Sequence, residues 1–312
     1  MRSVADRKGQ RIVFEVCVIG HLTKDIVQTG DREKELPGGT AYYSSVALRK
    51  LGMSVAVVTK LNRRDISLVK ELEREDVRVF WARSDRTTTF KNVNKEGSDD
   101  REQWVRAVAD PFSHSDVAGV EAKIFHLGPL TQEEISPEEI QYLAEKAVVS
   151  LDVQGFVRKV EETDRDWAAV RQVQWNEKEK VLPYVNVLKA NEEEARFLSQ
   201  EHDLERIAAD LSRQGPEEVL ITCGGDGSLL YAGGRPHWIL AYPPKRKVDP
   251  TGAGDTYMAA YLYYRNKTNC LDEAAKFAAM ASSLKLEHYG PFRGGEEDVR
   301  AFAARSESTP CV

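Results

Sequence analysis

Residues 249–264 read DPTGAGDTYMAAYLYY, and this stretch predicts a glycine turn that opens a buried helix. Four residues recur at the i, i+3, i+4 and i+7 spacing of one helix face: Tyr257, Ala260, Tyr261 and Tyr264. Gly252 and Gly254 precede them and permit backbone angles and close approaches that other residues resist. The amides of residues 252–255 would then point out of the helix amino terminus, where they form an electropositive cradle for a phosphate group.

Asp255 places an acidic side chain inside this predicted anion site. A base that accepts the proton of a hydroxyl attacking the phosphate would explain it. The alternative is an aspartate that only caps the helix. A Gly-x-Gly pattern alone is common, whereas the complete DPTGAGD string is far more specific, so the sequence favours the base.

The composition indicates a globular protein with ample material for a core: 312 residues, 41% hydrophobic and 30% charged. The net charge of −6 gives no electrostatic reason to expect nucleic acid or an anionic membrane as partner. No apolar run reaches the ~20 residues that span a bilayer, and residues 1–11 show no signal peptide. The four cysteines lie far apart without metal-type spacing, which favours free thiols and a cytoplasmic location.

Strands and helices alternate along most of the chain. Strand-like runs at 12–20 and 54–61 flank a helix that follows Gly38 and Gly39, and a helix at 66–75 precedes a strand at 77–83. From residue 123 onward strands alternate with helices, and the segment after VVSLDVQG reads as a charged helical stretch that runs to Lys180. This order predicts an α/β fold with a doubly wound, mostly parallel sheet flanked by helices.

Two β-rich segments, about 12–40 and 80–108, do not fit the alternation. The second reads as a hairpin whose turn is NKEGSDDRE. We expect one domain over residues 12–305, with disordered tails at 1–11 and 306–312.

The DPTGAGD string resembles the C-terminal signature of the ribokinase-like (PfkB) family of sugar and nucleoside kinases, and further landmarks extend the resemblance over nearly the whole chain. The resemblance implies that the two β-rich segments form a small lid sheet over the active site. It also implies that ATP is the phosphoryl donor and that Asp255 is the general base. Gly252, Ala253 and Gly254 would form the anion hole around the transferred group.

The resemblance assigns Asn191 and Glu194, in KANEEEARF, to an Asn-x-x-Glu motif that orients Mg²⁺ and its waters. Their i, i+3 spacing puts both on one face of a first helical turn, and Mg²⁺ takes few protein ligands. A capping box would give the same spacing. The spacing alone therefore does not predict a magnesium site. The prediction rests on the position of this motif between the other motifs of the family.

Other donor-side positions also follow from the resemblance. Lys189 matches a lysine that reaches the ATP phosphates, with a solvated lysine as the alternative. Thr222, Gly224 and Gly227, in ITCGGDGSLL, match a nucleotide-binding turn, although GGDG is simply a good turn by itself. Asp249 and Thr251 match positions near a monovalent cation site, taken as K⁺, that residues 278–290 would flank.

The predicted acceptor site contains five residues: Asp25, Gly39, Thr40, Tyr43 and Asp152. The family's acceptor-binding aspartate, which accepts two hydroxyl hydrogen bonds, corresponds to Asp25. Ribokinase carries Asn where this chain has Tyr43. The strings GHLTKDIV, GGTAYYSSVAL and LDVQGFVR are similar instead to the myo-inositol kinase branch, and Arg158 in the last string is a further candidate.

The sequence therefore predicts an ATP-dependent kinase that acts on a cyclic polyol, with myo-inositol as first candidate. A nucleoside kinase, a furanose sugar kinase and a non-catalytic ATP or sugar sensor stay open as alternatives. No GxxxxGK[ST] string is present, which argues against P-loop chemistry. The resemblance also raises a homodimer formed through the lids, which the sequence leaves open.

Overall fold

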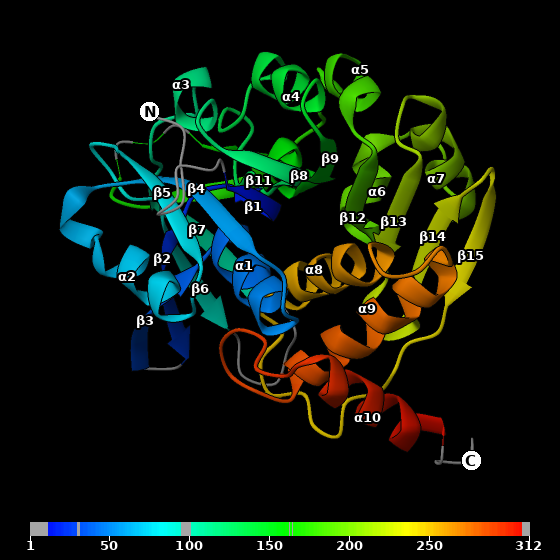
Figure 1. The fold of residues 1–312 in the computed structure, drawn as a ribbon. Helices are drawn as coiled ribbons and strands as arrows, with labels where there is room; N and C mark the ends of the chain where they lie inside the picture. The colour runs from blue at the N-terminus through cyan, green and yellow to red at the C-terminus, as the bar shows by residue number, and fades with distance from the viewer. Residues whose placement is uncertain (1–11, 30–31, 95–100, 162, 164, 308–312) are drawn as a thin grey trace.

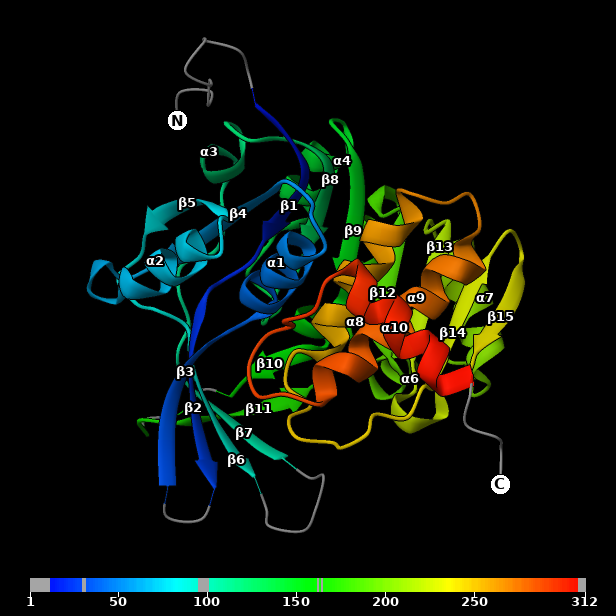
Figure 2. The same ribbon diagram turned by 60° about the horizontal axis from the view of Figure 1, so that its bottom comes forward.

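The computed structural model describes residues 12–29, 32–94, 101–161, 163 and 165–307. Within these residues the strands form two sheets, one of nine strands and one of six. Figure 2 shows the smaller sheet extending from one side of the larger sheet and its helices.

The nine-stranded sheet has the order β15-β14-β13-β12-β9-β8-β1-β4-β5. Its strands are β1 (Val13–Ile19), β4 (Val55–Leu61), β5 (Arg78–Arg83), β8 (Glu121–Leu127), β9 (Val148–Asp152), β12 (Val187–Asn191), β13 (Glu218–Thr222), β14 (Ser228–Ala232) and β15 (Arg235–Ile239). Neighbours from β5 to β13 pair in parallel, whereas β14 and β15 are antiparallel additions at one edge. The predicted doubly wound sheet is confirmed.

Helices cover both faces of this sheet (Figure 1). One face carries α1 (Thr40–Lys50), α2 (Ser67–Arg74), α8 (Ala253–Arg265), α9 (Leu271–Leu286) and α10 (Glu296–Glu307). The other carries α3 (His114–Val117), α4 (Pro137–Ala144), α5 (Lys178–Val181), α6 (Glu192–Leu198) and α7 (Leu204–Arg213). Short 3₁₀ turns lie at Arg63–Asp65, Val153–Val157, Leu182–Tyr184 and Gly224–Asp226.

The central helix α8 buries the face that its apolar spacing predicts. Tyr257, Ala260 and Tyr261 are each at most 3% exposed. Tyr264 is partly exposed and stacks on Phe277 of α9, with ring centroids 4.6 Å apart. This packing fixes the amino terminus of α8 relative to the sheet.

The six-stranded sheet has the order β10-β11-β7-β6-β2-β3. Its strands are β2 (Thr23–Thr29), β3 (Arg32–Gly38), β6 (Thr89–Asn94), β7 (Arg101–Ala107), β10 (Arg158–Val160) and β11 (Ala168–Gln172). Only the β2–β6 pair is parallel. A small core of Phe90, Val105, Leu130 and Ala168 lies against it.

The expected bounds of the small sheet need correction. The segments 12–40 and 80–108 contribute β2, β3, β6 and β7, but β1 is a buried strand of the main sheet, between β8 and β4, and β5 is an edge of that sheet. Residues 158–160 and 168–172, expected as helix, form β10 and β11 instead. Val160, Ala168 and Val170 all pack on the small core, as the inward-facing residues of strands do. The charged residues around them hide this pattern in the sequence. The predicted turn at 95–100 lies outside the described residues.

The tails expected at 1–11 and 306–312 overlap the described residues only at 306 and 307. Helix α10 continues to Glu307, two residues past the expected domain end at 305. Residues 1–11 and 308–312 lie outside the described part. In that part, no helix is both long and apolar enough to cross a membrane.

Candidate active site

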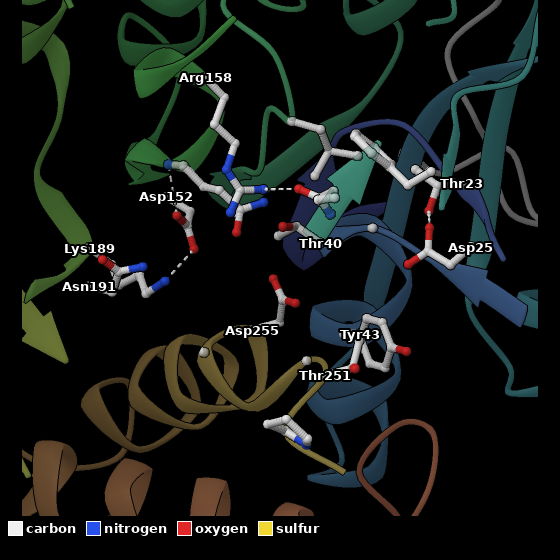
Figure 3. Close-up of a pocket in the computed structure, with 18 of the residues that line it drawn as sticks. Thr23, Asp25, Thr40, Tyr43, Asp152, Arg158, Lys189, Asn191, Thr251 and Asp255 are labelled. Atoms are coloured by element: carbon white, nitrogen blue, oxygen red, sulfur yellow. Dashed lines mark hydrogen bonds and ion pairs between the residues drawn. The ribbon is translucent and has the colours of Figure 1, made fainter. Parts of the chain in front are cut away.

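A pocket of about 340 Å³ lies where the two sheets meet the amino termini of α1 and α8 (Figure 3). The small sheet contributes side chains from β2, β6, β7 and β10. The main sheet contributes the carboxyl ends of the parallel strands β9, β12 and β13, the edge at which open α/β sheets bind ligands. The lining residues from these elements and helices include Asp25, Thr40, Asp152, Lys189, Asn191 and Asp255.

The amino terminus of α8 forms the predicted anion cradle at one wall of this pocket. Gly252 is the N-cap residue, with a left-handed φ of 77°. A Cβ atom there would lie 2.2 Å from Cδ1 of Tyr43, so only glycine fits. At Gly254 an added Cβ would lie 3.1 Å from Nζ of Lys189. The ring of Tyr43 and the ammonium of Lys189 therefore hold the turn on both sides.

The carboxylate of Asp255 faces the pocket from the first turn of α8. It accepts a hydrogen bond from the hydroxyl of Thr40. Ser44 donates to the backbone carbonyl of Asp255 at 3.2 Å, which joins α1 to α8. The N-cap position belongs to Gly252, and no side chain caps this helix end. The geometry therefore does not make Asp255 the N-cap.

Burial raises the pKa of Asp255 most, and the nearby carboxylate of Asp152 also raises it, while Lys189 and the Thr40 hydroxyl act in the opposite direction; together these effects give a pKa of about 6. A carboxylate with this pKa is ionised at neutral pH and still basic enough to take a proton.

Lys189 and Asp152 form a buried ion pair at the back of the pocket. Their Nζ and Oδ2 atoms are 2.9 Å apart, and both side chains are less than a tenth exposed. Burial acts to lower the pKa of Lys189, but the carboxylates of Asp152, Glu194 and Asp255 outweigh it and raise the pKa. Lys189 is therefore a permanent cation beside the anion cradle.

The charges around Asp255 predict how the rate depends on pH. The base must be ionised, so kcat/KM should rise with pH through about 6 and then level off. Lys189→Met removes a cation that lowers the pKa of Asp255, so this acid limb should move to higher pH. Asp152→Asn removes a carboxylate that raises the pKa of Asp255, so the acid limb of the pH profile should move to lower pH. Opposite shifts distinguish Asp255 from titration of the donor phosphates, and shifts of equal sign would contradict the assignment.

Asn191 and Glu194 form a reciprocal capping box at the start of α6. The Glu194 amide donates to Oδ1 of Asn191 at 2.7 Å, and the Asn191 amide donates to Oε2 of Glu194 at 2.9 Å. Glu194 is 1% exposed, and its other oxygen, Oε1, is a buried acceptor with no partner among the described residues. Burial raises the pKa of Glu194, Lys189 lowers it, and Asp152 raises it. An unsatisfied carboxylate oxygen beside a pocket-lining amide fits a hydrated Mg²⁺.

This pair yields a prediction about metal dependence. Glu194→Gln should keep the cap and raise the Mg²⁺ concentration needed for half-maximal rate, because it removes the charge that attracts the ion. Rates across a MgCl₂ titration measure this, with Glu193→Gln, an exposed neighbour on the same helix, as control. A lowered melting temperature with unchanged Mg²⁺ dependence would leave only the capping role.

The opposite end of the pocket contains Asp25 on β2. Its Oδ1 accepts a hydrogen bond from the Thr23 hydroxyl at 2.6 Å. A Cβ atom at Gly38 would lie 2.4 Å from Oδ2 of Asp25, and one at Gly39 would lie 2.4 Å from the His21 carbonyl. The two glycines therefore let the entry to α1 pass directly beside this carboxylate.

The aromatic pair at the start of α1 does not act as one surface. Tyr43 lines the pocket, whereas Tyr42 turns away and donates to Glu71 at 3.3 Å. His21 is a buried structural residue and does not line the pocket. Its ring nitrogens lie 3.1 Å from the Asp110 carbonyl and 3.0 Å from the Thr88 hydroxyl.

Several pocket residues escaped the sequence reasoning. Gln103, Phe90 and Leu130 line the acceptor end, and Arg158 donates to Oε1 of Gln103 at 3.2 Å. Arg158 is on β10 and Gln103 on β7, so this contact bridges strands of the small sheet beside the main-sheet pocket wall. The alternating pattern in 101–107 could have marked Gln103 as one of a set on a single face, but not which face.

The remaining donor-side residues divide into two groups. Thr222, Gly224 and Thr251 line the pocket with Lys189 and Asn191. Gly227 does not line it: its φ is 100°, and an added Cβ would lie 2.1 Å from the Ile239 carbonyl, so it serves the turn. Asp249 is also outside the lining and contacts the buried Lys285.

A glycine cradle at a helix terminus, a pocket-facing carboxylate and a buried cation together define a phosphotransferase that acts on a hydroxyl of a small molecule. The comparisons with known proteins agree with this class. The chain belongs to the pfkB family of carbohydrate kinases, whose profile matches residues 13–296.

Among solved structures, a pyrophosphate-dependent kinase of the ribokinase family, complexed with a pyrophosphate analogue and myo-inositol, superposes with a TM-score of 0.80 at 30% identity. The match covers 92% of this chain and 99% of that one. The ribokinase of Arabidopsis thaliana with ribose and ATP has a TM-score of 0.73 at 21% identity, over 93% and 99% of the two chains, and supports the fold alone.

Among characterised relatives, the cytidine kinase of Thermococcus kodakarensis is 24% identical over 298 residues, which are 89% of this chain and 98% of the relative. The inositol 3-kinase of Arabidopsis thaliana is 26% identical over 286 residues, 88% of this chain and 74% of the relative. The predicted family and fold are confirmed, and the chain is a kinase of small sugar-like or polyol-like hydroxyl compounds.

Proposed function

We propose that this protein transfers the γ-phosphoryl group of ATP to a hydroxyl of a small cyclic polyol, with myo-inositol as the first candidate. The observation that carries the proposal is the Asp255 carboxylate, which faces one pocket together with the glycine cradle, Lys189 and Asp25. A protein that only binds ATP or a sugar has no use for a base at that place.

The acceptor end of the pocket supports a cyclitol. Its apolar surface comes from Tyr43, Phe90 and Leu130, and its polar groups include Asp25 and Gln103. A cyclitol presents axial hydrogens on a flat ring face and hydroxyls around its rim, which suits such a surface. A nucleoside stays the main competitor, because aromatic rings also stack on bases and a cytidine kinase is among the relatives.

The proposed reaction is an in-line displacement at the γ-phosphorus. Asp25 binds acceptor hydroxyls and orients the ring, and Asp255 accepts the proton of the attacking hydroxyl. The new bond joins the acceptor oxygen to the γ-phosphorus as the bond to the β,γ-bridging oxygen breaks, and ADP leaves with that electron pair. The amides of residues 252–255 and the ammonium of Lys189 stabilise the negative charge on the transferred group. Mg²⁺, oriented by Asn191 and Glu194, would neutralise phosphate charge when bound.

Pyrophosphate is the second candidate donor. At the donor end Pro250 is the only apolar side chain among the described lining residues, which there comprise Lys189, Asn191, Thr222, Gly224, Pro250, Thr251, Gly252 and Gly254. An adenine ring binds best between apolar surfaces, whereas pyrophosphate requires amides and cations only. The similarity to a pyrophosphate-dependent kinase supports the same candidate.

A two-way substrate panel tests the proposal. With ATP and with pyrophosphate as donor, kcat/KM is measured for myo-inositol, adenosine, cytidine, ribose, fructose and fructose 6-phosphate. We expect myo-inositol well ahead, because a site that hydrogen-bonds particular hydroxyls rejects analogues lacking them. A nucleoside ahead of myo-inositol would remove the cyclitol assignment and leave the kinase, and no turnover with any pair would favour a sensor.

Asp25→Ala should abolish acceptor binding and leave donor binding intact, because Asp25 lies at the opposite end of the pocket from Lys189 and Asn191 (Figure 3). Calorimetric titration with each ligand measures the two affinities. Glu33→Ala, an exposed change on neighbouring β3, is the control. Equal weakening of donor and acceptor would contradict the role of Asp25.

A further inference from the structure

A lysine side chain, Lys285, is fully shielded from solvent in the last turn of α9. Lysine is almost never completely buried without a partner of opposite charge. Its partner is Asp249, which lies three residues before the N-cap glycine of the anion cradle.

The ammonium contacts two oxygens of the same aspartate. Lys285 Nζ donates to the Asp249 backbone carbonyl at 2.7 Å and lies 3.4 Å from the carboxylate oxygen Oδ2. Carbonyl and carboxylate oxygens are also the ligands that alkali cations take. The last turn of a helix adds a negative potential that favours a cation.

The carboxylate of Asp249 has further donors. Its Oδ1 accepts from the Thr251 amide at 2.9 Å, and its Oδ2 accepts from the Gly290 amide at 3.1 Å. The Asp249 amide itself donates to the Leu286 carbonyl at 3.3 Å. The turn 249–251 is thus fixed to the end of α9, and Lys285 supplies the positive charge of that junction.

The K⁺ site that the sequence resemblance implies at Asp249 and Thr251 does not fit these residues, because Lys285 Nζ already contacts the Asp249 oxygens that a cation would use. We propose that the ammonium of Lys285 replaces a monovalent cation, and that this protein therefore works without K⁺. Lys285 is not among the residues that line the pocket. It is a positioning residue that holds the turn 249–251 and, through it, the Gly252 cradle.

Two variants distinguish the loss of the positive charge from the loss of the side-chain volume. Lys285→Met removes the ammonium and keeps most of the side-chain volume, whereas Lys285→Ala also leaves room for an ion beside Asp249. Lys276→Met is the matched control, since Lys276 is on the same helix and forms an exposed pair with Asp272. Melting temperatures of the substrate-free proteins are recorded in KCl, NaCl and tetramethylammonium chloride at constant ionic strength. This readout does not depend on kinase activity, so it stands even if the proposed acceptor is wrong.

We expect the melting temperature of the wild type to be the same in all three salts, and likewise that of Lys276→Met. Lys285→Ala should melt lower in tetramethylammonium and recover in KCl, and Lys285→Met should melt lower in every salt. With the best substrate pair, kcat should fall roughly 10- to 100-fold in Lys285→Met, because displacing reacting groups by about 1 Å costs up to ~10²-fold. K⁺ should restore turnover to Lys285→Ala only.

Activation of the wild type by K⁺ over tetramethylammonium would overturn the proposal. So would a folded Lys285→Ala protein whose melting temperature and kcat do not respond to K⁺. If Lys285→Ala does not fold in any salt, the proposal stands or falls on Lys285→Met, whose kcat must then fall in KCl as much as in tetramethylammonium.

Discussion

Asp255→Asn should lower turnover by at least ~10²-fold, the usual loss when general-base catalysis is removed. The amide keeps the shape of the side chain and can still accept the Thr40 hydrogen bond, but it cannot take a proton from the acceptor. Donor binding should survive, because the cradle amides and Lys189 are unchanged. The measurements are steady-state rates and donor affinity by calorimetry.

The same variant should melt at a higher temperature than the wild type at neutral pH. The pKa of Asp255 is raised in the folded protein, so its ionisation opposes folding as the pH rises through about 6. Asp272→Asn, in the first turn of α9 and outside the pocket, serves as control and should keep full activity. Near-normal turnover of Asp255→Asn would show that the base lies elsewhere.

Gly252→Ala should lower kcat by roughly 10²-fold, comparable with the loss of one preorganised hydrogen-bond donor at an oxyanion site. The new Cβ would lie 2.2 Å from Cδ1 of the buried Tyr43 ring, so the turn must shift and carry the cradle amides with it. The left-handed φ of 77° adds a stability cost of roughly 1–2 kcal/mol for any residue with a Cβ atom.

Gly234→Ala separates the two effects. Gly234 has nearly the same φ, 78°, but an added Cβ there meets nothing within 4 Å. Gly234→Ala should lower the melting temperature, because of the backbone conformation alone, and retain full kcat. If Gly252→Ala also lost only stability, with kcat unchanged, the turn would not be part of the catalytic machinery.

Local sequence chemistry was enough to predict the main elements. Gly252 and the apolar spacing from Tyr257 onward mark a turn and a buried helix, because both depend on neighbouring residues alone. The alternation of strands and helices likewise predicted the parallel sheet, since parallel neighbours require helical crossovers. The motif around Asp255, with the resemblance it carries, led to the confirmed kinase family, while the individual site residues stay predictions.

The same local reasoning failed where one segment had two plausible structures. The sequence from 158 to 172 carries charges at a density typical of an exposed helix, yet residues 158–160 form β10 and residues 168–172 form β11. Their few apolar residues find a partner only in the small core around Phe90, which belongs to a different part of the chain. Likewise Tyr42 and Tyr43 are adjacent, but the helix turns one toward Glu71 and the other toward the pocket.

The sequence by itself determined the elements and the position of the glycine turn, because these follow from short-range periodicity, and its motifs carried the resemblance that led to the family. Only the tertiary structure decided which charges meet. The ion pairs Lys189–Asp152 and Lys285–Asp249 each join residues more than 30 positions apart, and the Tyr43 ring closes on Gly252 from another helix. A buried charge must find its partner wherever the topology of the sheet brings one. Burial in the pocket raises the pKa of Asp255, the Lys189–Asp152 pair adjusts it, and the second pairing places an ammonium beside Asp249.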